Sequence, residues 1–102
     1  METFKKKRVE IILEQPMVRP MLHLIEKLGV TGYTMLPHLS GKGHTGERGE
    51  TDLSGALANA MIIVITSQDQ AHRLMEQGLK LLTDRTGIIY MSDVEVARDQ
   101  HF

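Results

Sequence analysis

The stretch MIIVITSQDQAHRLMEQGLKLL, residues 61–82, places a strand signal directly before a helix signal. Its first part, Met61 to Ile65, is an unbroken apolar run, which is typical of a strand that is buried on both faces. Residues 67–70 (SQDQ) then match a capping box, in which a serine and a glutamine three residues later satisfy free N–H groups at a helix start. The predicted helix has an apolar stripe that comprises Ala71, Leu74, Met75, Gly78 and Leu82.

The N-terminal third of the chain predicts a second pair of elements. Residues 8–13 (RVEIIL) carry apolar side chains at every second position, which indicates a strand. After Pro20, apolar residues recur at helical spacing as far as Leu28, and Gly29 follows where a helix C-terminus favours a left-handed residue. A short helix is therefore predicted between Pro20 and Gly29.

Two further strands complete the predicted fold. Residues 31–36 form one, closed by Pro37, and residues 88–91 form the other, followed by a short extended tail at 94–96. The order β-α-β-β-α-β predicts an α+β fold, the ferredoxin-like sandwich, in a single domain of residues 1–102 with both helices on one face of the sheet. Because the strands at 61–65 and 88–91 are apolar on both faces, we expect copies of the chain to cover the other face in a homo-oligomer.

Composition excludes several classes of function. Twelve basic and thirteen acidic residues nearly cancel, so no net field draws the chain to nucleic acid, and the basic cluster at 5–8 is better explained as the solvated start of a strand. Without cysteine there is no disulfide, thiolate metal site or cysteine nucleophile. No apolar run is long enough to span a bilayer. We therefore expect a soluble, cytoplasmic protein.

Residues 40–55 (SGKGHTGERGETDLSG) form an unusually long connection between two strands of a hairpin. They hold five of the nine glycines, whereas such connections commonly need about 2–5 residues in total. Free backbone N–H groups around Ser40 to Gly43 could surround an anion, with Lys42 adding positive charge. A flexible linker explains the same composition equally well.

Catalysis finds little support in the sequence. No nucleophile elbow or zinc-hydrolase motif is present, and the acidic candidates Glu47, Glu50 and Asp52 all lie in the 40–55 loop, which does not hold a catalytic group firmly. We therefore do not expect an enzyme. A divalent-metal site formed by His38, His44 and Asp52 is an alternative, although its spacing matches no standard metal signature.

Several segments resemble the PII signalling family, in the same order along the chain. The resemblance covers residues 8–98 and is closest to the PII-like proteins associated with bicarbonate transport and carboxysomes. The segments that carry it are Gly29-Val30-Thr31-Gly32-Tyr33-Thr34, Lys42-Gly43-His44-Thr45, Arg48-Gly49 and Ile88-Ile89-Tyr90-Met91-Ser92-Asp93-Val94-Glu95.

This resemblance implies a homotrimer that binds adenine nucleotides in the clefts between its subunits. The loop at 40–55 would be the flexible T-loop that contacts a partner, and residues 83–87 would be the B-loop. On the adenine side the implied residues are Gly32, Tyr33, Thr34, Ile63 and Val64. On the phosphate side they are Ser40, Gly41, Lys42 and Gly43, with Arg85, Thr86 and Gly87 of the B-loop and Arg98 from the neighbouring subunit.

Three departures from the family pattern refine what the resemblance implies. The B-loop lacks the family's longer glycine-rich run and its lysine, which favours ADP or AMP over ATP. The T-loop contains no tyrosine, so it offers no acceptor for uridylylation. Ser40 or Gly41 replaces the glutamine that helps to hold 2-oxoglutarate, which argues against nitrogen sensing.

The resulting expectation is a regulator of inorganic-carbon and energy state that takes ADP or AMP, with bicarbonate as a second, small-anion ligand. Its partner would be a transporter or a carboxysome-linked protein. The alternatives are a trimeric ferredoxin-like metal-tolerance protein and a phosphohydrolase, of which the second lacks a firmly held base.

Overall fold

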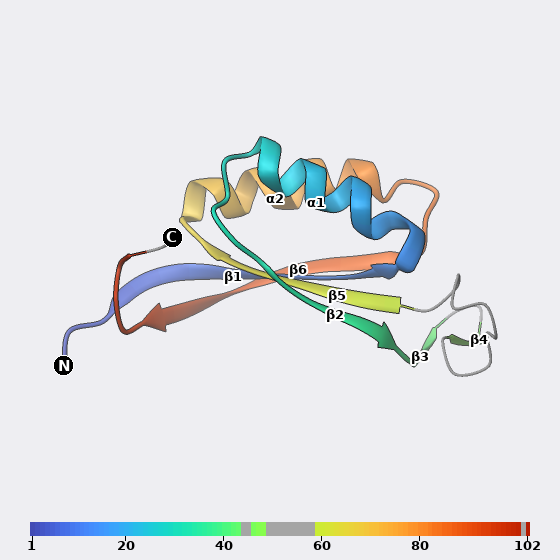
Figure 1. Ribbon diagram of the computed structural model, residues 1–102, viewed down its shortest axis with the longest axis horizontal. Helices are drawn as coiled ribbons and strands as arrows, with labels where there is room; N and C mark the ends of the chain where they lie inside the picture. Colours follow the sequence, from blue (N-terminus) through green and yellow to red (C-terminus); the bar gives the residue numbers. More distant parts are fainter. Residues whose placement is uncertain (44–45, 49–58, 101) are drawn as a thin grey trace.

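The computed structural model describes residues 1–43, 46–48, 59–100 and 102. Four strands form one antiparallel sheet in the order β2-β5-β1-β6, and both helices cover the same face of it (Figure 1). The predicted β-α-β-β-α-β arrangement is therefore confirmed. The elements are β1 (Phe4–Glu14), a 3-10 turn (Gln15–Met17), α1 (Val18–Lys27), β2 (Thr34–Leu39), β3 (Gly41–Gly43), β4 (Gly46–Arg48), β5 (Asn59–Thr66), α2 (Gln68–Leu81) and β6 (Gly87–Val96).

The hydrophobic core lies between the helices and the sheet. Every second residue of β5 from Ala60 to Thr66 is buried there, and β1 contributes a parallel set at alternate positions. The side chains that are almost completely buried are Val9, Ile11, Leu13, Met21, Ile25, Ile62, Val64, Thr66 and Leu74. The stripe predicted for α2 is confirmed, with Ala71, Leu74, Gly78 and Leu82 buried and Met75 partly buried.

Within the single chain, residues 61–65 are fully buried on one face only, as expected for a strand whose second apolar face is left for other copies of the chain to cover. Ile62 and Val64 face the helices and are fully buried, whereas Met61, Ile63 and Ile65 are half-buried on the opposite face. The two helices cover one face only, so the described part of the chain leaves the second set of apolar side chains partly exposed. We call this second surface the open face.

A row of apolar side chains crosses the open face from edge to edge. Strand register places Leu36 of β2 beside Met61 of β5, Met61 beside Ile12 of β1, and Ile12 beside Ile88 of β6. Leu36 and Ile88, on the two edge strands, are 43% and 56% exposed, so the row is open to water at both of its ends. Ile89, one residue away, turns to the other face and packs against the core.

Two prolines lie inside elements that they were expected to border. α1 begins at Val18, before Pro20, because the first turn of a helix has no intrahelical partner for the N–H that proline lacks. β2 runs through Pro37 to Leu39 instead of ending before it. Proline is tolerated there because β2 is an edge strand and the register shifts between Leu36 and Leu39.

Strand β6 is longer than its sequence signal suggested. It continues from Gly87 to Val96, and its pairing with β1 extends as far as Phe4 and Val96. β5 pairs with β1 only from Lys7 onward, so the ends of β1 and β6 project beyond β5 as a two-stranded ribbon (Figure 1). Among the described residues, neither helix is long and apolar enough to cross a membrane.

We expect Ile62→Ala to lower the free energy of unfolding by about 2–5 kcal/mol, because it empties space in the core beneath the helices. Leu79→Ala is the matched control, since Leu79 is 64% exposed on α2 and leaves no cavity. Urea denaturation measures both. An equal loss for the two variants would contradict the assignment of the core.

Candidate functional site

One group of predicted site residues meets where β2 begins. Thr34 pairs with Ile63 across β2 and β5, and both side chains lie on the open face. Tyr33, one residue earlier, is 45% exposed. Val64 differs, because its side chain is fully buried against the helices, on the face opposite to Thr34 and Ile63.

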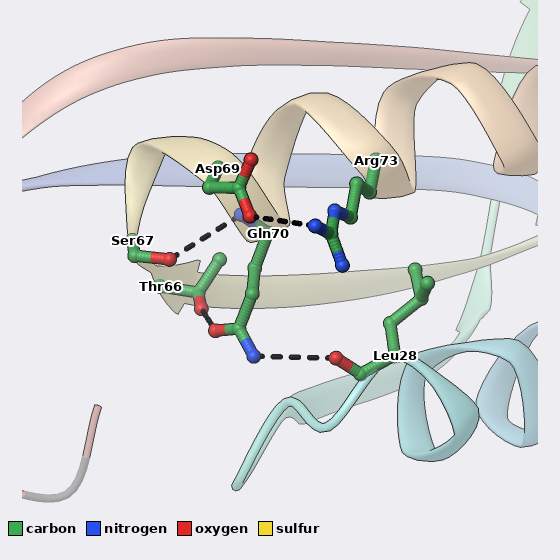
Figure 2. A network of polar contacts seen from close by, with 6 residues as sticks. All are labelled: Leu28, Thr66, Ser67, Asp69, Gln70 and Arg73. Carbon is green, nitrogen blue, oxygen red and sulfur yellow. Dashed lines mark hydrogen bonds and ion pairs between the residues drawn. The ribbon is translucent and has the colours of Figure 1, made fainter.

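The loop that carries Gly32 and Tyr33 is held by Gln70 (Figure 2). The Gln70 side-chain nitrogen Nε2 donates to the carbonyl oxygen of Leu28 at 3.2 Å, and its Oε1 accepts from the hydroxyl of Thr66. Gly29 follows with φ +82°, the left-handed conformation that ends α1. The end of α1, the end of β5 and the start of α2 are therefore fixed to one another beside this loop.

Gln70 also corrects the sequence interpretation of the helix start. Ser67 acts as predicted, since its hydroxyl accepts from the Gln70 N–H at 3.3 Å. The Gln70 side chain, however, points away from Ser67 toward Leu28 and Thr66 (Figure 2). The serine half of the capping box is therefore formed, whereas the glutamine side chain makes tertiary contacts with Leu28 and Thr66 instead of returning to the helix start.

The base of the predicted T-loop is more regular than its composition suggested. Beyond the bulge in β2, Ser40 leads into a small hairpin in which Lys42 of β3 pairs with Glu47 of β4. Residues 41–43 and 46–48 are the part of the predicted T-loop, after Ser40, that the structure describes. His44 and Asp52 of the alternative metal site lie outside the described residues, within which no cluster of potential metal ligands occurs.

The predicted B-loop is a tight turn between α2 and β6. The Arg85 N–H donates to the carbonyl oxygen of Leu82 at 2.9 Å, and Arg85 and Thr86 are exposed. Close packing favours Gly87, because a Cβ at this position would lie 3.1 Å from the Ile12 carbonyl oxygen. The turn therefore presents its side chains outward at the beginning of β6.

A residue with a left-handed backbone conformation lies just before the T-loop, and another lies in the B-loop. His38, at the T-loop base, has φ 58°, and Asp84, in the B-loop, has φ 63°. Among the described residues these are the non-glycine residues with positive φ. Such conformations cost free energy and concentrate at functional sites, which supports a binding role for these two loops.

The two loops lie at the same end of the sheet but at opposite edges. Leu39 pairs with Asn59, Asn59 with Glu14, and Gly87 with Leu13, so all of them lie at one end. β2 and β6 are separated by β5 and β1, which corresponds to about 14 Å at the usual strand spacing. Each chain therefore presents two separate half-sites.

Arg98 lies far from both half-sites of its own chain. It follows β6, which starts at Gly87 and ends at Val96. At the rise of an extended strand β6 is about 30 Å long, so Arg98 lies near the end of β6 that is far from the B-loop turn. The structure thus does not bring Arg98 together with the other predicted residues within one chain.

A polar cluster on the open face was missed by the sequence analysis. Arg8 Nη2 lies 3.1 Å from Glu10 Oε1, and the Tyr90 hydroxyl donates to Glu10 Oε2 at 3.2 Å. Partial burial, reinforced by the Glu10 carboxylate, raises the pKa of the Tyr90 phenol and keeps it a proton donor. A glutamate between the apolar residues of β1 was the available signal, but its partner on β6 is set by strand register.

Comparisons with known proteins agree on one family. The family model for nitrogen regulatory protein P-II matches residues 6–101. CPII, a nitrogen regulatory PII-like protein from Thiomonas intermedia bound to ADP, AMP and bicarbonate, is 30% identical with a TM-score of 0.87, over 95% of this chain and 92% of that one.

Two further results complete the comparisons. The form of CPII bound to ADP and bicarbonate gives 31% identity and a TM-score of 0.83, over 95% and 93% of the two chains. A PII-like signalling protein from Thermus thermophilus shares the fold, with a TM-score of 0.82 at 22% identity over 100% and 99%. The search of curated proteins gives no match.

We expect Gln70→Leu to destabilise the protein by about 1–3 kcal/mol, because it leaves the buried Thr66 hydroxyl and the Leu28 carbonyl without this partner. Amide hydrogen exchange should become faster in residues 28–33, which connect α1 to β2. Gln77→Leu, the same change on the same helix, is the control and should leave exchange there unchanged. Unaltered exchange in Gln70→Leu would show that another contact holds the loop.

Proposed function

This chain belongs to the family of the nitrogen regulatory protein P-II, and we propose that it is a regulatory protein that binds ADP or AMP in clefts between the subunits of a homotrimer. The observation that carries the proposal is the separation of the two half-sites. The T-loop base and the B-loop lie at one end of the sheet on opposite edges, so one chain cannot close both around a single nucleotide.

A cyclic assembly resolves this separation. When the β2 edge of one subunit meets the β6 edge of the next, the two kinds of half-site face each other, and the same contact repeats until the ring closes. Arg98, distant from the half-sites of its own chain, is then available to a neighbour. The symmetry order of three comes from the family resemblance.

The open face supplies the contact area for such a ring. Its apolar row would be removed from water by further copies of the chain, which is the usual role of an exposed patch of this kind. The charged Glu10 side chain within it is 13% exposed and already paired with Arg8 and Tyr90. This pairing lowers the cost of burying the carboxylate in an interface.

The nature of the ligand follows from the comparisons and the half-sites. CPII structures of about 30% identity contain ADP, AMP and bicarbonate, which supports adenine nucleotides as the ligand class here. A Cβ at Gly32 would meet nothing within 4 Å, so the packing of the chain does not itself require glycine beside Tyr33 and Thr34. A nucleotide base approaching this position would account for it.

The same considerations support ADP or AMP over ATP. The B-loop turn from Thr83 to Gly87 offers few backbone donors and no lysine for a third phosphate. Arg85 and Thr86 at the turn, with Ser40, Gly41, Lys42 and Gly43 at the T-loop base, would hold the shorter phosphate chain. Bicarbonate would bind beside it as the second ligand, and the T-loop would transmit the occupied state to a transporter or carboxysome-linked partner.

We expect light scattering to give the mass of a trimer. Ile63→Asp should produce monomers with unchanged far-ultraviolet circular dichroism, because it places a charge in the middle of the open face and leaves the core intact. Leu79→Asp, on the exposed side of α2, is the control and should stay trimeric. A monomeric wild-type protein would disprove the assembly.

Calorimetric titration of the trimer tests the ligand class. ADP and AMP should bind more tightly than ATP in the absence of added metal, because the extra charge of the γ-phosphate lacks a compensating donor in the B-loop. Arg98→Ala should weaken every phosphorylated nucleotide by about tenfold or more, as expected for a lost charge-assisted contact. A clear preference for ATP would contradict this account of the site.

Bicarbonate should raise the affinity for ADP, and ADP should raise the affinity for bicarbonate by the same factor, as linkage requires. The physical reason is that the glycine-rich T-loop loses conformational freedom when it closes, and two ligands share that cost. The measurement is ADP titration with and without bicarbonate at fixed pH and ionic strength. Chloride is the control, and an equal response to it would exclude a specific co-ligand.

A further inference from the structure

The C-terminal segment after β6 folds back on the first strand. β6 ends at Val96, and the chain then turns so that residues 97–100 lie near the N-terminal part of β1 (Figure 1). The contact is specific, because Lys6 Nζ lies 2.7 Å from Asp99 Oδ1. Arg98, the neighbour of Asp99 in sequence, is therefore fixed to the ribbon of β1 and β6 through this ion pair.

Lys6 makes a second contact with the same segment. Its Nζ lies 5.8 Å from the centre of the Phe102 ring, within the range of a cation–π interaction. The Lys6 side chain is 15% exposed, although it is a lysine at the end of an edge ribbon. The Lys6 ammonium group thus contacts the segment at two positions, Asp99 and Phe102.

Lys6 lies on a different face of the sheet from its neighbour Lys7. Side chains alternate along a strand, so Lys6 lies on the open face with Arg8 and Glu10, whereas Lys7 lies on the helix face. Lys7 pairs with Asp93 of β6 and does not reach the C-terminal segment in any contact among the described residues. Of the neighbouring lysines, Lys6 is the one that fixes the segment on the face proposed to meet other subunits.

We propose that Lys6 is a positioning residue that clamps Asp99 and Phe102 and thereby directs Arg98 toward the nucleotide phosphates of the neighbouring subunit. This inference rests on the proposed function, in which Arg98 reaches across the interface. Arginine carries its charge on a long, flexible side chain. Its contribution to ligand affinity is therefore larger when its backbone is already held in place before the ligand binds. The clamp therefore lowers the conformational entropy that Arg98 loses when the nucleotide binds.

The clamp also explains why an exposed tail has a defined path. Asp99 is 59% exposed, so its pairing with Lys6 would count for little if both partners were in water. The Lys6 side chain, however, is only 15% exposed and its Nζ lies 5.8 Å from the centre of the Phe102 ring, so the pair is less solvated than one on an open surface. Nucleotide affinity should therefore respond to Lys6 although this residue is not proposed to contact the nucleotide.

The test measures ADP affinity by calorimetry for wild type, Lys6→Met, Arg98→Ala and the double variant, with light scattering on each. Methionine keeps the length and apolar stem of the lysine and removes its charge. We expect Lys6→Met to weaken ADP by about three- to tenfold in an intact trimer. In the Arg98→Ala background, Lys6→Met should have no further effect, because the residue that it positions is already absent.

Two additional variants exclude a merely structural role. Lys7→Met removes the other ion pair of the ribbon and should leave ADP affinity unchanged. Lys6→Asp should weaken ADP, and adding Asp99→Lys to it should restore most of the affinity, since the pair is rebuilt with reversed charges. Should Lys6→Met fail to form trimers, Asp99→Asn tests the same ion pair from the side of the tail.

The outcomes separate the clamp from the proposed function. If Arg98→Ala weakens ADP binding but Lys6→Met and Asp99→Asn do not, the clamp is wrong and the proposed function stands. Equal losses from Lys6→Met and Lys7→Met, or full additivity with Arg98→Ala, would also overturn it. If Arg98→Ala itself leaves ADP affinity unchanged, the role of Arg98 across the interface is wrong, and the clamp falls with it.

Discussion

The structure depends on one constraint: two helices can cover only one face of a four-stranded sheet. The core forms where α1 and α2 pack on the alternate residues of β1 and β5, and these side chains are almost completely buried. The other face keeps a row of apolar side chains from Leu36 to Ile88 in contact with water. Hydrophobic burial is the main driving force of association, so this face points to assembly with further copies of the chain.

In the proposed trimer, the topology of the sheet would couple assembly to ligand binding. The order β2-β5-β1-β6 sends the predicted T-loop base and B-loop to opposite edges at the same end. A nucleotide held by both loops would bridge two subunits, so its binding would depend on how the subunits are arranged. His38, near the end of β2, and Asp84, in the B-loop, have left-handed backbone conformations that local preference disfavours.

The C-terminal segment lies at the end of the sheet opposite the two loops, and it too bears on the proposed assembly. Lys6 contacts both Asp99 and Phe102, and in the proposed trimer this would present Arg98 to a neighbouring subunit. The Arg8, Glu10 and Tyr90 cluster lies on the same face, with its charges already paired. Polar and apolar parts of the open face are thus both suited to burial between subunits.

The sequence by itself determined the order and type of the elements. Periodicity of two and of 3.6 residues, the Ser67 cap and the apolar stripe of α2 depend on near neighbours, so local patterns suffice to predict them. Only the tertiary structure decided that β2 continues through Pro37, that Gln70 bonds to Leu28, and that Lys6 pairs with Asp99. These contacts join residues distant in sequence, and strand register and helix placement, which no local pattern specifies, bring them together.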